Sequence, residues 1–183
     1  MSTSGPGATN LITGIACSYF DSIPNLHITG QVNLHEQRGG MPGTSRSRQI
    51  GFQETDIVSI SKPVTKKSIQ LKKAEDIHKT LDDLYYCANT GRKGPVLLDL
   101  PMCLQRKGVV NKKTSKIKKI FKKTRLLDIE NIYKLLKTSK RPVILTGGGV
   151  RYSNSVKEFN ELIKTLKIPV VSTWSGIDTI DSG

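Results

Sequence analysis

The stretch Thr3-Ser4-Gly5-Pro6-Gly7-Ala8-Thr9-Asn10 leads directly into an apolar run over residues 11–20. Glycine tolerates backbone angles that other residues avoid, and the proline fixes φ between the two glycines, so the stretch predicts a tight turn. Thr9 or Asn10 can cap the helix that follows, whose apolar residues recur at helical spacing. Such a turn can hold an anion or the edge of a cofactor at the helix N-terminus. A strand-to-helix turn without a ligand is the commoner case.

The clearest strand is Val96-Leu97-Leu98-Asp99-Leu100, which lies between two prolines. Its near-continuous apolar run predicts a strand buried on both faces of a parallel sheet. An amphipathic helix is predicted over residues 74–90, and Gly91 marks its end. Other segments of the same half predict strands at 26–29 and within 64–71, a short helix within 52–60, and a long loop over 32–51.

A second set of elements follows residue 127. The pattern predicts a helix over 128–138, a strand over 143–146, a glycine turn over 147–149, a helix from Ser153 or Asn154 to residue 167, and a strand over 169–173. Strand, helix and strand in this order form a βαβ unit. The fold class is therefore α/β, with parallel sheets and flanking helices in two partial domains. We place these domains at residues 1–104 and 127–183, joined by a basic linker over 105–126.

The formal charge of +14 on 183 residues is concentrated in one segment. Residues 106–125 hold ten basic and no acidic side chains. Such a run is more often a solvated linker than a surface for nucleic acid or another polyanion. Three distant cysteines without a CxxC pair favour reduced thiols and a cytoplasmic location. The sequence shows neither an apolar run of about 18 residues nor a signal-peptide pattern, so we expect no membrane partner.

Six motifs carry a family resemblance: TSGPGATNL (3–11), DSIP (21–24), ITGQV (28–32), GFQETDIV (51–58), KPVTK (62–66) and TGRKGPVLLDLP (90–101). Each is only moderately specific, whereas their order and spacing together are highly specific. In its motifs and in their order and spacing, the chain resembles thiamine diphosphate-dependent enzymes of the acetolactate synthase type. Residues 141–176 resemble the start of the family's central domain, so the resemblance covers nearly the whole chain except the linker.

The resemblance implies acyl-carbanion chemistry on a 2-oxo acid, performed on thiamine diphosphate that is held with Mg²⁺ in the complete enzyme. By position, Gln53 resembles the glutamine that faces cofactor and substrate, and its amide both donates and accepts hydrogen bonds. Phe52 resembles the neighbouring phenylalanine of the substrate pocket, although a phenylalanine taken alone is more often part of a core. Thr3 and Asn10 lie where the family's turn approaches the aminopyrimidine ring of the cofactor or the dimer interface. The resemblance assigns no metal ligand to this chain.

Gly148, Thr173 and Trp174 match positions at which acetolactate synthases touch FAD, so FAD is implied as a further cofactor. From the residues alone, a plain strand-to-helix turn at 147–149 is equally plausible, and a sole tryptophan is more often a packing residue. The family also implies a homodimer or homotetramer for the complete enzyme. The loop over 33–50 differs from the family pattern, so another 2-oxo acid or an aldehyde is as plausible a substrate as that of acetolactate formation.

The sequence contains neither the family's activating glutamate nor its Gly-Asp-Gly magnesium module, which lie upstream and downstream of the matched region. We therefore expect the chain alone to be an inactive fragment of such an enzyme. Two alternatives stay open. The chain can be a non-catalytic subunit that dimerises with a full-length enzyme through residues 11–20, or a basic module that binds polyanions through residues 106–125.

Overall fold

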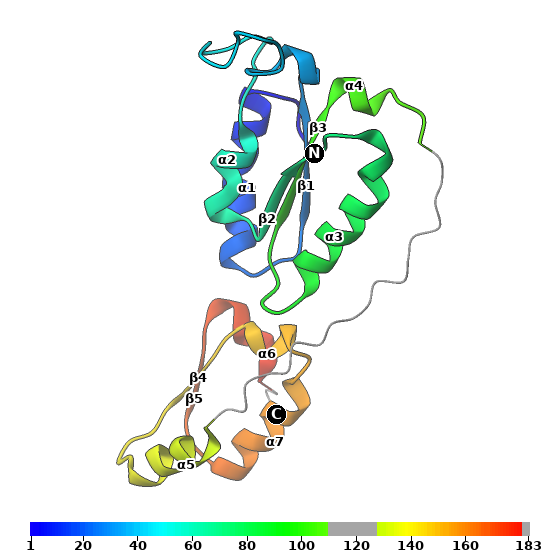
Figure 1. Cartoon of the computed structure of the whole chain (residues 1–183). Coiled ribbons are helices and arrows are strands. Elements are labelled where there is room, and N and C mark those ends of the chain that lie inside the picture. The colour runs from blue at the N-terminus through cyan, green and yellow to red at the C-terminus, as the bar shows by residue number, and fades with distance from the viewer. Residues whose placement is uncertain (110–127, 181–183) are drawn as a thin grey trace. The chain divides into compact units, whose positions relative to one another are not determined.

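A computed structural model describes residues 1–109 and 128–180 of the chain (Figure 1). The described residues fall into two compact units, one on each side of the gap. The boundaries at 104 and 127 stay a prediction, because most of the predicted linker lies outside the described residues.

The first unit is a parallel sheet with helices on both faces (Figure 1). Its three strands lie in the order β1-β3-β2, and both pairings are parallel. The strands are β1 (Leu26–Gln31), β2 (Lys67–Gln70) and β3 (Val96–Pro101). The helices are α1 (Pro6–Phe20), α2 (Ile57–Ser61), α3 (Ile77–Asn89) and α4 (Met102–Gln105), with short 3₁₀ turns at Leu34–Glu36, Lys62–Val64 and Ala74–Asp76.

The central strand β3 carries the core of this unit. Leu98 belongs to an apolar cluster with Leu84 of α3 on one face of the sheet. Leu97 belongs to a second cluster with Ile15 of α1 and Ile57 of α2. Successive side chains of a strand point to opposite faces, so the uninterrupted apolar run supplies both clusters. The prediction of a parallel strand buried on both faces is confirmed.

The start of the first helix differs from the prediction. The helix begins at Pro6, and Gly5 is its N-cap residue, with φ 59° and ψ −126°. The fixed φ of proline suits the first helical position, so the helix can start inside the glycine stretch. The Thr9 hydroxyl donates to the Pro6 carbonyl oxygen at 3.1 Å, and Asn10 lies within the helix. The prediction that Thr9 or Asn10 caps this helix is therefore wrong.

Other elements of the first unit occur in the predicted order with shifted ends. The helix predicted within 52–60 starts only at Ile57 and extends to Ser61, because residues 51–56 before it are not helical. The helix predicted over 74–90 opens with a 3₁₀ turn before α3, and β1 continues past Gly30 to Gln31. Gly91 follows α3 with φ 65°, a left-handed angle that ends a helix without strain in glycine.

The second unit is a βαβ unit, as the sequence predicts. Its parallel strands are β4 (Ile144–Thr146) and β5 (Val170–Ser172). Its helices are α5 (Ile129–Thr138), α6 (Gly149–Tyr152) and α7 (Val156–Leu166), followed by a 3₁₀ helix over Trp174–Thr179. The N-cap of α7 is Ser155, so the predicted cap at Ser153 or Asn154 is wrong. Asn154 instead adopts φ 58° in the turn between α6 and α7.

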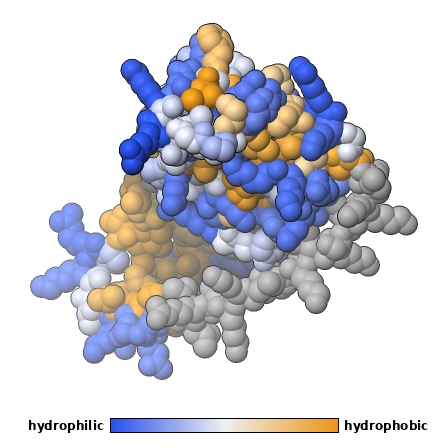
Figure 2. All heavy atoms as spheres, turned by 45° about the horizontal axis from the view of Figure 1, so that its top comes forward, coloured by the Kyte–Doolittle hydropathy of each residue, from blue (hydrophilic) through white to orange (hydrophobic). Residues whose placement is uncertain are grey.

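The visible surface of the first unit is mostly hydrophilic, with apolar side chains gathered in small patches (Figure 2). Within the described ranges, no helix has both the length and the apolar character needed to cross a membrane. The same ranges contain no group of three or more histidine, cysteine, aspartate or glutamate side chains that could hold a metal ion.

Candidate functional site

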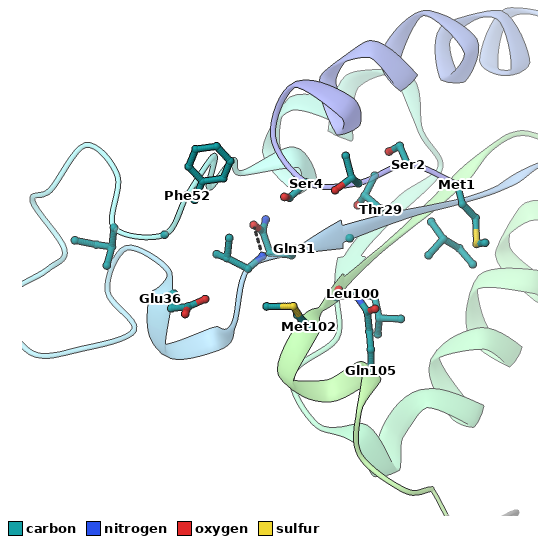
Figure 3. A pocket seen from close by; sticks show the side chains of 16 residues that line it. Met1, Ser2, Ser4, Thr29, Gln31, Glu36, Phe52, Leu100, Met102 and Gln105 are labelled. Atoms are coloured by element: carbon teal, nitrogen blue, oxygen red, sulfur yellow. Dashed lines mark hydrogen bonds between the residues drawn. The ribbon is translucent and has the colours of Figure 1, made fainter.

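A cavity of about 790 Å³ opens at the carboxyl edge of the sheet in the first unit (Figure 3). The ends of β1 and β3, the segment before α1 and a turn before α2 form its walls. The lining residues are 1–4, 28–32, 50–52, Glu36, Leu100, Met102 and Gln105. In open α/β sheets, ligands bind beyond the carboxyl ends of the strands, so the cavity lies where a ligand is expected.

The glycine turn before α1 touches the turn that carries Gln53. A Cβ atom added to Gly5 would lie 2.6 Å from the Cβ of Gln53 and 2.7 Å from its carbonyl oxygen. Only glycine leaves room for this approach, and only glycine readily adopts the backbone angles observed there. Gln53 itself has a positive φ of 56°, which is uncommon outside glycine. The two turns are therefore fitted closely against each other.

The structure brings three of the four residues predicted near thiamine diphosphate and substrate to one place. Thr3 and Phe52 line the cavity, and Gln53 follows Phe52 on the turn that contacts Gly5. The Phe52 side chain is 81% exposed, so the interpretation of this residue as ordinary core is wrong. Asn10 is exposed on α1 and is not among the cavity's lining residues. The catalytic and cofactor-binding roles of all four stay predictions.

Sequence reasoning missed a polar network beneath the cavity. Asp99 of β3 is only 1% exposed. Its Oδ1 accepts a hydrogen bond from the Thr29 hydroxyl at 2.8 Å, and its Oδ2 accepts from Gln31 Nε2 at 3.2 Å and from Gln70 Nε2 at 2.8 Å. Buried acids are rare unless they are paired. A lone aspartate inside an apolar strand could thus have indicated a buried polar network. Its partners on β1 and β2 could not have been predicted from the sequence.

Burial raises the pKa of the Asp99 carboxyl, although hydrogen bonds from Gln70, Thr29 and Gln31 partly oppose this shift. Above the unfolded-state pKa of about 3.9, the folded state then holds the proton more firmly than the unfolded state does. The free energy of unfolding should therefore fall as pH rises from about 4 through the raised native pKa. Asp99→Asn lacks this titration, so urea unfolding between pH 4 and 8 should show the wild type losing stability relative to the variant. A wild type that gains on the variant with rising pH would contradict this expectation.

Glu36 is the one carboxylate among the residues that line the cavity. Its Oε2 accepts a hydrogen bond from the Asn33 backbone N–H at 3.0 Å, within a capping box at the start of the 3₁₀ turn. Hydrogen bonds from the side chain and then the backbone of Asn33 lower the Glu36 pKa. The side chain is thus held as an ionised cap, which makes it a poor proton carrier at neutral pH.

The three residues predicted to meet FAD gather at the carboxyl edge of the second unit's sheet. A Cβ on Gly148 would lie 3.0 Å from the Ser175 carbonyl oxygen, and the hydroxyls of Thr173 and Ser175 lie 3.3 Å apart. Trp174 follows β5 and is 91% exposed, so it is not a packing residue of this unit. A larger residue at 148 would therefore have to push against Ser175. A role for these residues in flavin binding stays a prediction.

Comparison with known families assigns the chain to a class of protein. Residues 1–60 match the family described as thiamine pyrophosphate enzyme, N-terminal TPP binding domain, and residues 129–183 match thiamine pyrophosphate enzyme, central domain. One match lies on each of the two units. The chain belongs to the thiamine pyrophosphate enzyme family.

Within this family the chain is similar to acetolactate synthase large subunits. It is 39% identical over 182 residues to that of Lactococcus lactis subsp. lactis, an alignment that covers 97% of this chain and 30% of the relative. It is 40% identical over 169 residues to a probable acetolactate synthase large subunit of Methanocaldococcus jannaschii, covering 88% of this chain and 27% of the relative. The chain therefore spans about 30% of the length of such relatives.

Proposed function

We propose that the chain is part of a thiamine diphosphate-dependent 2-oxo-acid decarboxylase or carboligase of the acetolactate synthase type, inactive by itself. The observation that carries this proposal is the meeting of Thr3 and Phe52 around one cavity, with Gln53 fitted against Gly5 beside it. Similarity to acetolactate synthase large subunits over nearly the whole chain supports the reaction class.

The residues around the cavity fit a ring that is apolar on its faces and polar at its edge. The buried hydroxyl oxygen of Ser2 has no hydrogen-bond partner within the described structure, so this hydroxyl is available to hydrogen-bond a ligand in the cavity. Ser2, Thr3 and Ser4 would hold the polar edge of the aminopyrimidine ring, and the exposed Phe52 ring would exclude water from the substrate. When bound, thiamine diphosphate supplies the carbanion chemistry. The Gln53 amide would orient the substrate by donating to its carboxylate or carbonyl oxygen.

The proposal extends to the complete enzyme. Mg²⁺ would bind with the cofactor's diphosphate on parts of the enzyme beyond this sequence, and FAD would lie against Gly148, Thr173 and Trp174. The complete enzyme would form a homodimer or homotetramer in the cytoplasm. A 2-oxo acid is its small-molecule substrate, and nucleic acid is not an expected partner.

A chimera tests the function. This 183-residue segment would replace the aligned segment of the Lactococcus lactis relative, and acetolactate formation from pyruvate would be measured with thiamine diphosphate and Mg²⁺. We expect the chimera to be active and the isolated chain to be inactive. Phe52→Ala and Gln53→Ala should each lower kcat/KM of the chimera about tenfold or more, a loss of at least about 1.4 kcal/mol of transition-state stabilisation.

Tyr85→Ala is the matched control, because Tyr85 is an exposed aromatic residue on α3 outside the cavity lining. Tyr85→Ala should change kcat/KM of the chimera by no more than about twofold, which corresponds to less than about 0.5 kcal/mol of transition-state stabilisation. A folded chimera that binds the cofactor but processes no 2-oxo acid would overturn the proposed reaction class. Equal losses in all three variants would remove Phe52 and Gln53 from the site.

The two alternative functions, a non-catalytic subunit and a polyanion-binding module, each have a separate test. A non-catalytic subunit that dimerises through residues 11–20 would co-purify with a full-length enzyme. The polyanion module rests on residues 106–125, most of which lie outside the described residues. It would be favoured by nucleic-acid binding that weakens steeply with salt and is lost when those lysines are neutralised.

A further inference from the structure

The Gln31 side chain connects the buried carboxylate of Asp99 to the turn that carries Phe52 and Gln53. Gln31 ends β1 and is 6% exposed. Its Nε2 donates to the Thr55 carbonyl oxygen at 2.7 Å and to Asp99 Oδ2 at 3.2 Å. Its Oε1 accepts from the Val32 backbone N–H at 3.0 Å, the bond drawn in Figure 3. Both N–H groups and the oxygen of this amide are thus engaged.

We define the site turn as residues 51–55. The carbonyl oxygen of Thr55, its last residue, accepts two hydrogen bonds. Besides Gln31, it accepts the Ile57 backbone N–H at 2.9 Å at the start of α2. The turn is closed on itself by the Glu54 N–H, which donates to the Gly51 carbonyl oxygen at 3.2 Å. One end of the turn is therefore tied to β1 through a single side chain.

Asp99 is a fixed anchor for that side chain. It pairs in register with Thr29 on β1 and with Gln70 on β2, and it accepts a hydrogen bond from both. Gln31 is thereby bonded to a group that is itself held from both neighbouring strands. A hydrogen-bond network of this kind is stiff when every member is satisfied.

We propose that Asp99 and Gln31 are positioning residues that hold the site turn at the cavity edge through the Thr55 carbonyl. Gln31 acts on Phe52 and Gln53 from the sheet side, and Gly5 limits the same turn by direct contact. The inference depends on the proposed function only where it gives Phe52 and Gln53 a catalytic role. The mechanical connection itself can be tested on the isolated chain.

Amide hydrogen exchange of the full 183-residue chain tests the connection. Gln31→Met removes the bond to Thr55 and keeps the side chain's length, whereas Gln70→Met removes an equivalent donor to Asp99 without touching the turn. The exchange rate of the Glu54 amide is divided by that of the Val96 amide, which donates to the Asn25 carbonyl oxygen at the sheet and reports global opening. We expect this ratio to rise about tenfold in Gln31→Met, the net worth of about one hydrogen bond, and to stay within about twofold in Gln70→Met.

Equal ratios in the two variants, or no rise in Gln31→Met, would overturn the proposal. Should Gln31→Met fail to fold, the unmodified chain provides a second measurement. The side-chain amide protons of Gln31 should exchange at least about tenfold more slowly than those of the exposed Gln53, because buried and bonded groups exchange only on opening. Similar rates for the two amides would also overturn it. An inactive chimera with a confirmed connection would contradict the proposed function alone.

Discussion

Gly5→Ala should lower the free energy of unfolding by about 2 to 4 kcal/mol. Part of this cost is backbone strain, because φ 59° with ψ −126° is a region that residues with a Cβ avoid. The other part is overlap, because the new Cβ would lie 2.6 Å from a side-chain atom and 2.7 Å from a backbone oxygen of Gln53. Neither atom is the free end of a flexible side chain, so relief requires the site turn or the start of α1 to move.

Gly14→Ala is the matched control in the same helix. Gly14 lies inside α1, and a Cβ added there meets no heavy atom within 4 Å. Alanine is the better helix former, so this variant should gain about 0.5 to 1 kcal/mol. Urea unfolding followed by far-ultraviolet circular dichroism measures both changes. A Gly5→Ala midpoint equal to that of the wild type would show that the two turns are not fitted together as described.

Leu98→Ala should cost about 2 to 5 kcal/mol of unfolding free energy. Leu98 is 1% exposed at the centre of β3 and packs in the cluster that joins the sheet to α3. Truncation to alanine removes buried apolar surface and leaves a cavity that the surrounding strands cannot fill completely. Because small domains are stable by only about 5 to 15 kcal/mol, this loss should remove a large part of the first unit's stability.

Leu98→Met tests whether the cost of Leu98→Ala comes from the lost side-chain volume. Methionine is apolar and similar in size, so this exchange should cost less than about 1.5 kcal/mol. Urea midpoints of the two variants, measured side by side, give the comparison. Equal costs would indicate that shape at this position matters more than the cavity, and two negligible costs would contradict the assignment of Leu98 to a closely packed core.

The sequence by itself determined the fold class because its signals are local and periodic. The unbroken apolar run of β3 predicts burial on both faces, and the amphipathic pattern before it predicts α3. The order and spacing of the motifs likewise identified the family that the comparisons show. Helix starts were less predictable, because glycine, proline, threonine and serine can each begin a helix and packing selects among them.

Only the tertiary structure decided how the candidate site is held. The hydrogen-bond partners of Asp99 lie on the two neighbouring strands, β1 and β2, and pairing by register cannot be read from one strand's composition. The exposure of Phe52 and Trp174 also contradicts the usual burial of aromatic residues, since Phe52 lies on the site turn and Trp174 lies just beyond the end of β5. Local patterns fix which elements form, whereas contacts between residues distant in the chain fix the cavity, because they exist only after β1, β2 and β3 have paired.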